Sequence, residues 1–156
     1  SSTIKTGDVQ VMSAGTGIQH SEFNPNADLQ TKLFQIWLFP KYRNVEPRYQ
    51  QITLDVAQQK NSFAQILSPN PEDEGVWIHQ DAWFHLGKID AQINLPYSFK
   101  KAGNGVYAFV LNGSFEIEGQ ILNNRDAIGI TDANQIDIKS LQDQSEILLM
   151  EVPMSF

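Results

Sequence analysis

The sequence contains no cysteine, which excludes disulfide bonds, thiolate-bound zinc, iron–sulfur clusters and a cysteine nucleophile. Any bound metal would therefore need histidine, aspartate or glutamate ligands. No apolar run approaches the ~20 residues that cross a bilayer, and the first residues lack the apolar stretch of a secretion signal, so we expect a cytoplasmic protein. Basic residues are scarce, because 11 Lys and Arg face 18 Asp and Glu, and the net charge of −7 disfavours nucleic acid or an anionic membrane as a partner.

Apolar residues recur mostly at every second position, which is the pattern of strands rather than of helices. The runs are short and are separated by Gly, Asn, Asp and Pro, which predicts an all-β sandwich or barrel. The predicted strands cover residues 8–12, 18–23, 32–39, 49–54, 63–67, 76–80, 84–89, 106–111, 115–118, 127–130, 135–139 and 146–152. Between two of these runs stands Asn112-Gly113, which predicts a β-hairpin with a type I′ turn.

The polar stretch 40–47 begins and ends with proline and follows a strongly apolar run. We interpret it as the boundary between two units, residues 1–47 and residues 48–156. The second unit is large enough for a complete β domain, whereas the first is too short for one. The acidic stretch 68–75 is predicted to be a surface loop within the second unit.

Candidate metal ligands gather at one place, where His20 and Glu22 are two residues apart. On an extended strand both side chains project from the same side, with their Cα atoms about 7 Å apart. An imidazole and a carboxylate suit Fe(II), Mn, Ni, Cu or Zn, and such sites activate dioxygen when coordination positions stay open. A half-exposed strand with one polar face would produce the same pattern.

The residues around His20 and Glu22 form a longer sequence motif. Gly7, Gly15, His20 and Asn24 resemble the second cupin motif, although Ser13 stands where proline is usual and two additional residues precede the histidine. The segment GDVQVMSAGTGIQHSEFNP, residues 7–25, resembles the pirin family, whose hallmark is Met-Ser/Thr-Ala-Gly-x-Gly-Ile-x-His-Ser-Glu. The similarity continues to residue 51 and is weaker beyond it.

The resemblance implies an all-β cupin fold, an RmlC-like jelly roll, in a bicupin whose first barrel is incomplete here. It also implies one divalent metal, Fe(II) first and Cu, Ni, Mn or Zn as alternatives. In the family three histidines and one glutamate hold the metal, and His20 and Glu22 match the last two. The other two come from a His-x-His motif one hairpin earlier, which nothing before Gly7 supplies. We therefore expect weak or absent metal binding by this chain. Residues 1–47 would be the last strands of the metal-binding amino-terminal cupin domain.

In residues 48–156 the same motif spacing places apolar or lysine side chains at the ligand positions, so this carboxy-terminal cupin domain is expected to be metal-free. The positions are Lys100, Ala102, Val106 and Ile136. His79 and His85 are expected to be ordinary surface or hydrogen-bonded histidines. Trp77, Trp83 and Phe84 are expected to lie in the barrel core or in a contact between the barrels.

The activity implied by the resemblance is quercetin 2,3-dioxygenase, which opens a flavonol ring with dioxygen. Glu22 would be a metal ligand and a catalytic base, and Gln35 and Trp37 would line the substrate pocket, with core packing as their alternative role. Two other interpretations stay open: a non-catalytic metal-binding regulator that senses redox state and binds a protein partner, or an inactive fragment.

The run that precedes the boundary is too apolar to remain in water, so residues 1–47 should pack against the second unit. Its apolar members are Leu33, Phe34, Ile36, Leu38 and Phe39. The open sheet edges of the first unit should be covered by another copy of the chain, by a separate fragment or by a swapped segment.

Overall fold

The computed structural model describes residues 2–155, in which the regular elements are strands and one short 3-10 helix, η1. The elements in chain order are β1 (Asp8–Ser13), β2 (Arg48–Thr53), η1 (Val56–Gln59), β3 (Phe63–Ser68), β4 (Val76–Trp77), β5 (Trp83–Ile89), β6 (Asn94–Ser98), β7 (Asn104–Asn112), β8 (Ser114–Ile117), β9 (Gln120–Asn123), β10 (Ala127–Ile130), β11 (Gln135–Ser140) and β12 (Ser145–Pro153). The all-β prediction is confirmed, and strands β6 and β9 had not been predicted.

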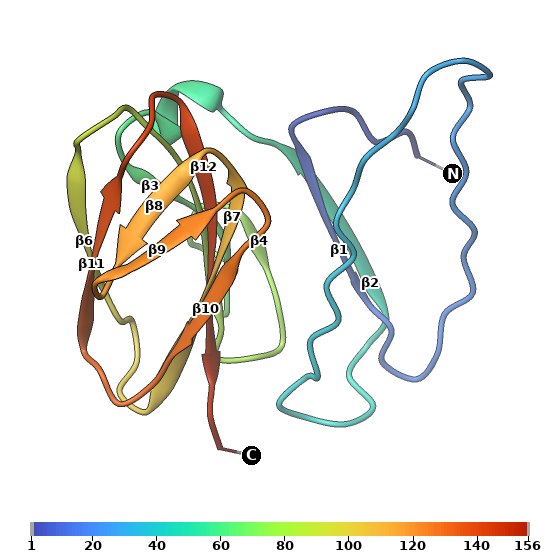
Figure 1. The fold of residues 1–156 in the computed structure, drawn as a ribbon. Coiled ribbons are helices and arrows are strands. Elements are labelled where there is room, and N and C mark those ends of the chain that lie inside the picture. Colours follow the sequence, from blue (N-terminus) through green and yellow to red (C-terminus); the bar gives the residue numbers. More distant parts are fainter. Residues whose placement is uncertain (1, 156) are drawn as a thin grey trace.

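Strands β3 to β12 form a sandwich of two sheets, and β1 and β2 form a separate antiparallel hairpin beside it (Figure 1). The larger sheet has the order β10-β7-β12-β5-β3-β4, and the smaller has the order β6-β11-β8-β9. Strand β2 begins at Arg48 and pairs with β1, so the hairpin joins strands from both sides of the boundary placed at residue 47. Helix η1 then leads from the hairpin into the sandwich.

The space between the two sheets is filled by apolar side chains. Ile136 and Val106, which the motif spacing places at the ligand positions of the second unit, are 1% exposed and belong to this core. The other members include Ile89, Ala108, Val110, Phe115, Ile117, Ile138, Ile147 and Leu149. An interior of this composition offers a metal no ligand at those two positions.

A second apolar cluster lies on the other face of the larger sheet, where the hairpin packs. Strand β12 contributes to both clusters because its side chains alternate: Ile147 and Leu149 point between the sheets, and Leu148 belongs to the second cluster. From the first unit, Val9, Val11 and Leu38 pack against this second cluster. The expected packing of residues 1–47 on the second unit is therefore present, but it involves few of the apolar residues of the run.

Most of that run stays in contact with solvent in the single chain. The exposed fractions are 63% for Leu33, 52% for Phe34, 43% for Ile36 and 77% for Phe39. Phe34 meets the Phe109 ring of the sandwich edge to face, with 5.5 Å between ring centroids. An apolar surface of this extent remains available to a partner.

Two strand predictions are wrong, because residues 18–23 and 32–39 are irregular segments of the long connection between β1 and β2. The alternation of apolar and polar residues indicates which face of a strand would be apolar. It does not show whether a neighbouring strand is present to form hydrogen bonds. Within residues 2–155 neither segment pairs with another strand. A strand without a paired edge has no reason to stay extended and flat.

The predicted hairpin around Asn112-Gly113 is also wrong. Strand β7 belongs to the larger sheet and β8 to the smaller one, so this dipeptide carries the chain from one sheet to the other. The two-residue hairpin turn lies instead at Glu118-Gly119, between β8 and β9. Both of its residues have positive φ, 50° and 74°, as a type I′ turn requires.

Candidate functional site

His20 and Glu22 lie in the irregular connection 14–47, and both are exposed. Glu22 is held by β1, because the side-chain amide of Gln10 donates a hydrogen bond of 3.0 Å to its Oε1. Val9 and Val11 point toward the sandwich, so Gln10 and Glu22 lie on the opposite face of the hairpin. His20 has no hydrogen-bond partner within residues 2–155. The predicted ligand pair is thus positioned through its carboxylate member alone.

The face of the hairpin that carries Gln10 is polar, and we call it the outer face: Asp8, Gln10, Tyr49, Gln51 and Thr53. The Tyr49 hydroxyl lies 3.2 Å from Oε1 of Gln10 and 2.5 Å from Oε1 of Gln51. Asp8 accepts hydrogen bonds from Thr53 at 2.7 Å and from Gln51 at 2.8 Å. The backbone N–H of Lys5 has the largest part in holding the pKa of Asp8 below its usual value, followed by the Thr53 hydroxyl.

The sequence interpretation missed this network around Glu22. The period of two along residues 8–12 indicates part of this network. Because the valines point inward, Asp8 and Gln10 must lie together on the other side of the strand. The register of β1 with β2, which places Gln10 opposite Gln51, is a long-range contact that the pattern could not give.

Gln35 and Trp37, the predicted pocket residues, contact one another: the indole N–H of Trp37 donates a hydrogen bond of 3.2 Å to Oε1 of Gln35. Trp37 is 87% exposed. Core packing, the alternative role for this residue, is therefore wrong for the chain by itself. A role in a substrate pocket stays a prediction.

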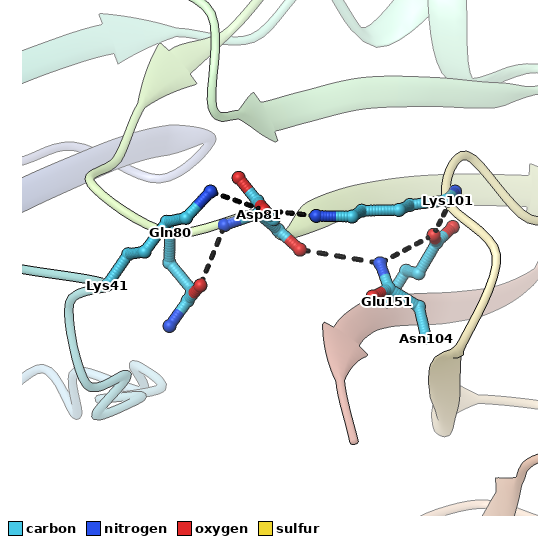
Figure 2. Close-up of polar contacts among 6 residues, drawn as sticks. All are labelled: Lys41, Gln80, Asp81, Lys101, Asn104 and Glu151. Carbon is cyan, nitrogen blue, oxygen red and sulfur yellow. Dashed lines mark hydrogen bonds and ion pairs between the residues drawn. The ribbon is translucent and has the colours of Figure 1, made fainter. Parts of the chain in front are cut away.

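The connection is fastened to the sandwich at its far end, as Figure 2 shows. The Lys41 ammonium lies 2.9 Å from Asp81, the Lys101 ammonium pairs with the same carboxylate, and the Gln80 amide donates to the carbonyl of Phe39 at 2.9 Å. Hydrogen bonding to Lys101, and then to Lys41, lowers the pKa of Asp81. Asp81 is thus occupied by two ammonium groups.

Neither His79 nor His85 lies in a cluster of side chains that could bind a metal ion. His79 meets the Trp77 ring edge-on, with 4.7 Å between ring centroids, and His85 is buried beside the Tyr97 hydroxyl at 3.3 Å. Within residues 2–155, no three side chains of His, Asp or Glu gather closely enough to hold a metal ion. None of the helical residues described forms a segment long and apolar enough to cross a membrane.

A β-sandwich of two mainly antiparallel sheets with an apolar interior, preceded by a hairpin whose connection contains a His-x-Glu segment, defines a cupin-type protein. Residues 65–152 match the family model described as the quercetinase C-terminal cupin domain, and residues 1–38 match the pirin model. The chain therefore belongs to the pirin family.

Two relatives are about one third identical to the chain over the aligned residues. A protein named quercetin 2,3-dioxygenase from Escherichia coli K12 is 33% identical over 150 residues, which are 96% of this chain and 63% of the relative. A pirin-like protein of Caulobacter vibrioides is 33% identical over 144 residues, 92% of this chain and 61% of the relative. The chain thus spans less than two thirds of these relatives.

Solved structures give the same result. The crystal structure of YhhW from Escherichia coli matches with a TM-score of 0.89 and 32% identity, covering 96% of this chain and 62% of that one. A crystal structure of the same bacterial pirin in complex with nickel(II) matches with a TM-score of 0.86 and 33% identity, covering 94% and 62%. The cupin fold expected from the sequence is confirmed.

Proposed function

We propose that this chain is part of a metal-dependent quercetin 2,3-dioxygenase, an enzyme that opens a flavonol ring with dioxygen. The observation that carries the proposal is the His20-x-Glu22 segment, which lies within the pirin match and is held on a polar face of the hairpin. The name of the Escherichia coli relative and the nickel(II) complex of the similar structure support a small-molecule reaction at a divalent metal.

In this proposal residues 1–47 belong to the metal-binding amino-terminal cupin domain, and residues 48–156 are the metal-free carboxy-terminal one. His20 and Glu22 would hold the ion together with further ligands. These ligands would not be other histidines or carboxylates of residues 2–155. The donor set fits a divalent transition metal, since it combines an imidazole with a carboxylate. When bound, the metal supplies Lewis acidity and chemistry toward dioxygen.

The chain's own residues determine how Glu22 would act. The Gln10 amide occupies Oε1 of the carboxylate, which leaves Oε2 for a metal or for the proton of a flavonol hydroxyl. A carboxylate fixed at one oxygen loses less side-chain freedom when it accepts that proton, and a general base must be fixed within hydrogen-bond reach. Gln10 is therefore a positioning residue for Glu22 in this proposal.

The test compares this chain with a version extended by the amino-terminal part that its relatives have, loaded in turn with Fe(II), Ni(II), Cu(II), Mn(II) or Zn(II). We expect about one ion per extended chain and much less than one in the shorter chain, because two ligands compete poorly with hydration. His20→Ala and Glu22→Gln should each weaken metal binding by at least about tenfold and lower quercetin-dependent oxygen uptake with it. His79→Ala, the matched control, should change neither.

Full metal content in the extended His20→Ala variant would contradict the ligand assignment. A non-catalytic regulator is the second candidate function, because the exposed apolar run of the connection offers a surface to a protein partner. Stoichiometric metal without oxygen uptake in the presence of quercetin would favour that candidate.

A further inference from the structure

A cavity of about 390 Å³ opens between the two sheets of the sandwich, where β6 of the smaller sheet faces β3 and β5 of the larger one. Its walls include Phe63, Leu95, Pro96, His85, Tyr97 and Lys100. This volume lies in the range of small-molecule sites. The cavity is separate from the His20 and Glu22 segment, which lies on the outer side of the hairpin.

Three buried polar side chains, Glu151, Tyr97 and His85, are linked by hydrogen bonds at the inner side of the cavity. Glu151, on the central strand β12, is completely buried and accepts hydrogen bonds from the Tyr97 hydroxyl at 2.9 Å, the backbone N–H groups of Lys100 and Lys101, and the Asn104 amide. Figure 2 shows the side of this carboxylate that faces Asn104 and Lys101. Because only donors surround it, the carboxylate acts as an acceptor and the Tyr97 hydroxyl must donate to it.

This arrangement fixes the proton of His85. The Tyr97 hydroxyl donates its hydrogen bond to Glu151, so its oxygen can only accept from Nδ1 of His85 at 3.3 Å. Nδ1 therefore carries the hydrogen, and Nε2 is the free acceptor. Within residues 2–155, Nε2 has no hydrogen-bond partner, and no buried side-chain nitrogen or oxygen is left without one. Nε2 is therefore reached from the cavity, although His85 as a whole is only 3% exposed.

The imidazole stays neutral at neutral pH, because burial lowers the pKa of His85 to about 4, with a further contribution from the Lys100 ammonium. A neutral Nε2 acceptor in the cavity wall selects a hydrogen-bond donor such as a hydroxyl group. Lys100, which is exposed and lines the same cavity, adds a positive charge near its opening. The Phe63 and Tyr97 rings, which meet edge to face, line the cavity together with the apolar Leu95 and Pro96, and this lining suits a flat apolar body between the two polar ends.

We propose that this cavity binds a single-ring hydroxylated aromatic acid, with the ligand hydroxyl donating to Nε2 of His85 and the ligand carboxylate directed to Lys100. Glu151 and the Tyr97 hydroxyl have positioning roles, since they set the tautomer of His85, and the Tyr97 ring also forms part of the cavity wall. The site is one for binding, and the proposal is independent of the reaction proposed for the first unit.

The test measures affinity for three probes by NMR titration of this chain: 4-hydroxybenzoate, benzoate and phenol. We expect 4-hydroxybenzoate to bind about tenfold more tightly than either of the others, because each lacks one of the two polar contacts. Lys100→Gln should weaken 4-hydroxybenzoate by a similar factor and leave phenol unchanged. Lys32→Gln, which removes the same charge from the exposed connection, should change neither.

The tautomer gives a second and independent measurement, because the sequence has only three histidines and their ring nitrogens can be assigned. We expect His85 to be the Nδ1–H tautomer in the free chain and its Nε2 resonance to move with 4-hydroxybenzoate but not with benzoate. A proton on Nε2, equal affinities for 4-hydroxybenzoate and benzoate, or no binding at about 10 mM, the weakest affinity expected for a ligand of this size, would each overturn the proposal.

Discussion

The carboxylate of Glu151 joins β12 to the Tyr97 phenol on β6, to two backbone N–H groups of the segment between β6 and β7, and to the Asn104 amide at the start of β7. Such a group stabilises the fold only while its donors are satisfied, because a buried donor without an acceptor carries its full desolvation cost. The period of two along residues 146–152 predicts that position 151 faces the interior with positions 147 and 149. Its four donors come from about 50 residues away in the chain, so no local pattern could identify them.

Replacement of Glu151 should therefore destabilise the sandwich strongly. We expect Glu151→Leu to lower the free energy of unfolding by about 3 kcal/mol, measured by urea denaturation, because four donor groups lose their acceptor. Glu146→Gln, on the same strand, removes a partly exposed carboxylate that pairs with Lys88 at 3.1 Å and should change stability by less than about 1 kcal/mol. Equal effects of the two substitutions would contradict the role given to Glu151.

His85 should make stability depend on pH in the mildly acidic range. Folding lowers the pKa of His85 from 6.5 to about 4, mainly by burial, so the unfolded chain binds more protons between these values. The contribution of neutral His85 is complete above about pH 6.5 and is lost as pH falls to about 4, on the order of 3 kcal/mol in all.

The measurement is a series of urea denaturation curves across this pH window. His85→Gln should flatten the dependence, since an amide does not titrate, whereas His79→Ala should leave it unchanged. A variant at position 85 that keeps the original slope would assign the pH dependence to another group.

At the scale of elements, two glycines show which turns the fold needs. Gly113, where the chain passes from β7 to β8, has a φ of 80°, and a Cβ there would lie 2.1 Å from the Ser145 Oγ and 2.9 Å from its Cα. Gly119, in the type I′ hairpin, has a φ of 74° and no atom within 4 Å of such a Cβ. The two positions share a positive φ, which would strain any other residue, and they differ in the space around them.

We expect Gly119→Ala to cost about 1 kcal/mol, the usual penalty for a side chain at positive φ, and Gly113→Ala to cost about 3 kcal/mol or more. Thermal or urea unfolding of the two variants measures the difference. If Gly113→Ala were as mild as Gly119→Ala, the close contact with Ser145 would be wrong.

The same turns explain what the sequence could and could not predict about the elements. The Asn-Gly dipeptide between alternating runs predicted a hairpin. The same dipeptide can also form a corner between two sheets, and only the pairing of β7 with β12 and β10 distinguishes the corner from the hairpin. Most strands of the sandwich were predicted because alternation matches their buried faces. Segments 18–23 and 32–39 have the alternation but lack a pairing partner in the described chain. The His20 and Glu22 pair was found from its motif, while Gln10 beside it depends on tertiary contacts.

At the scale of the whole molecule, the hairpin and the sandwich are joined in two ways. Val9 and Val11 bury one face of the hairpin on the larger sheet, and Lys41, Gln80 and Asp81 fasten the end of the connection. Between these attachments, residues 14–37 carry several exposed large apolar side chains. They include Phe23, Leu29, Leu33 and Trp37. Scattered exposed apolar residues are ordinary on a protein surface, but a concentration of them in one segment indicates a contact surface.

This distribution predicts that the chain associates with itself through residues 14–39 when no other partner is present. Sedimentation velocity over a range of concentrations should show a reversible shift toward dimers or larger species. Leu33→Asp should weaken this association by at least about tenfold, because a carboxylate placed in an apolar contact must lose its hydration. Ile121→Asp is the matched control, since Ile121 is 65% exposed on the sandwich and Leu33 is 63% exposed on the connection. Association that is unchanged by Leu33→Asp, or abolished equally by Ile121→Asp, would place the contact elsewhere. A chain that stays monomeric at every concentration would show that the exposed run does not bring two chains together.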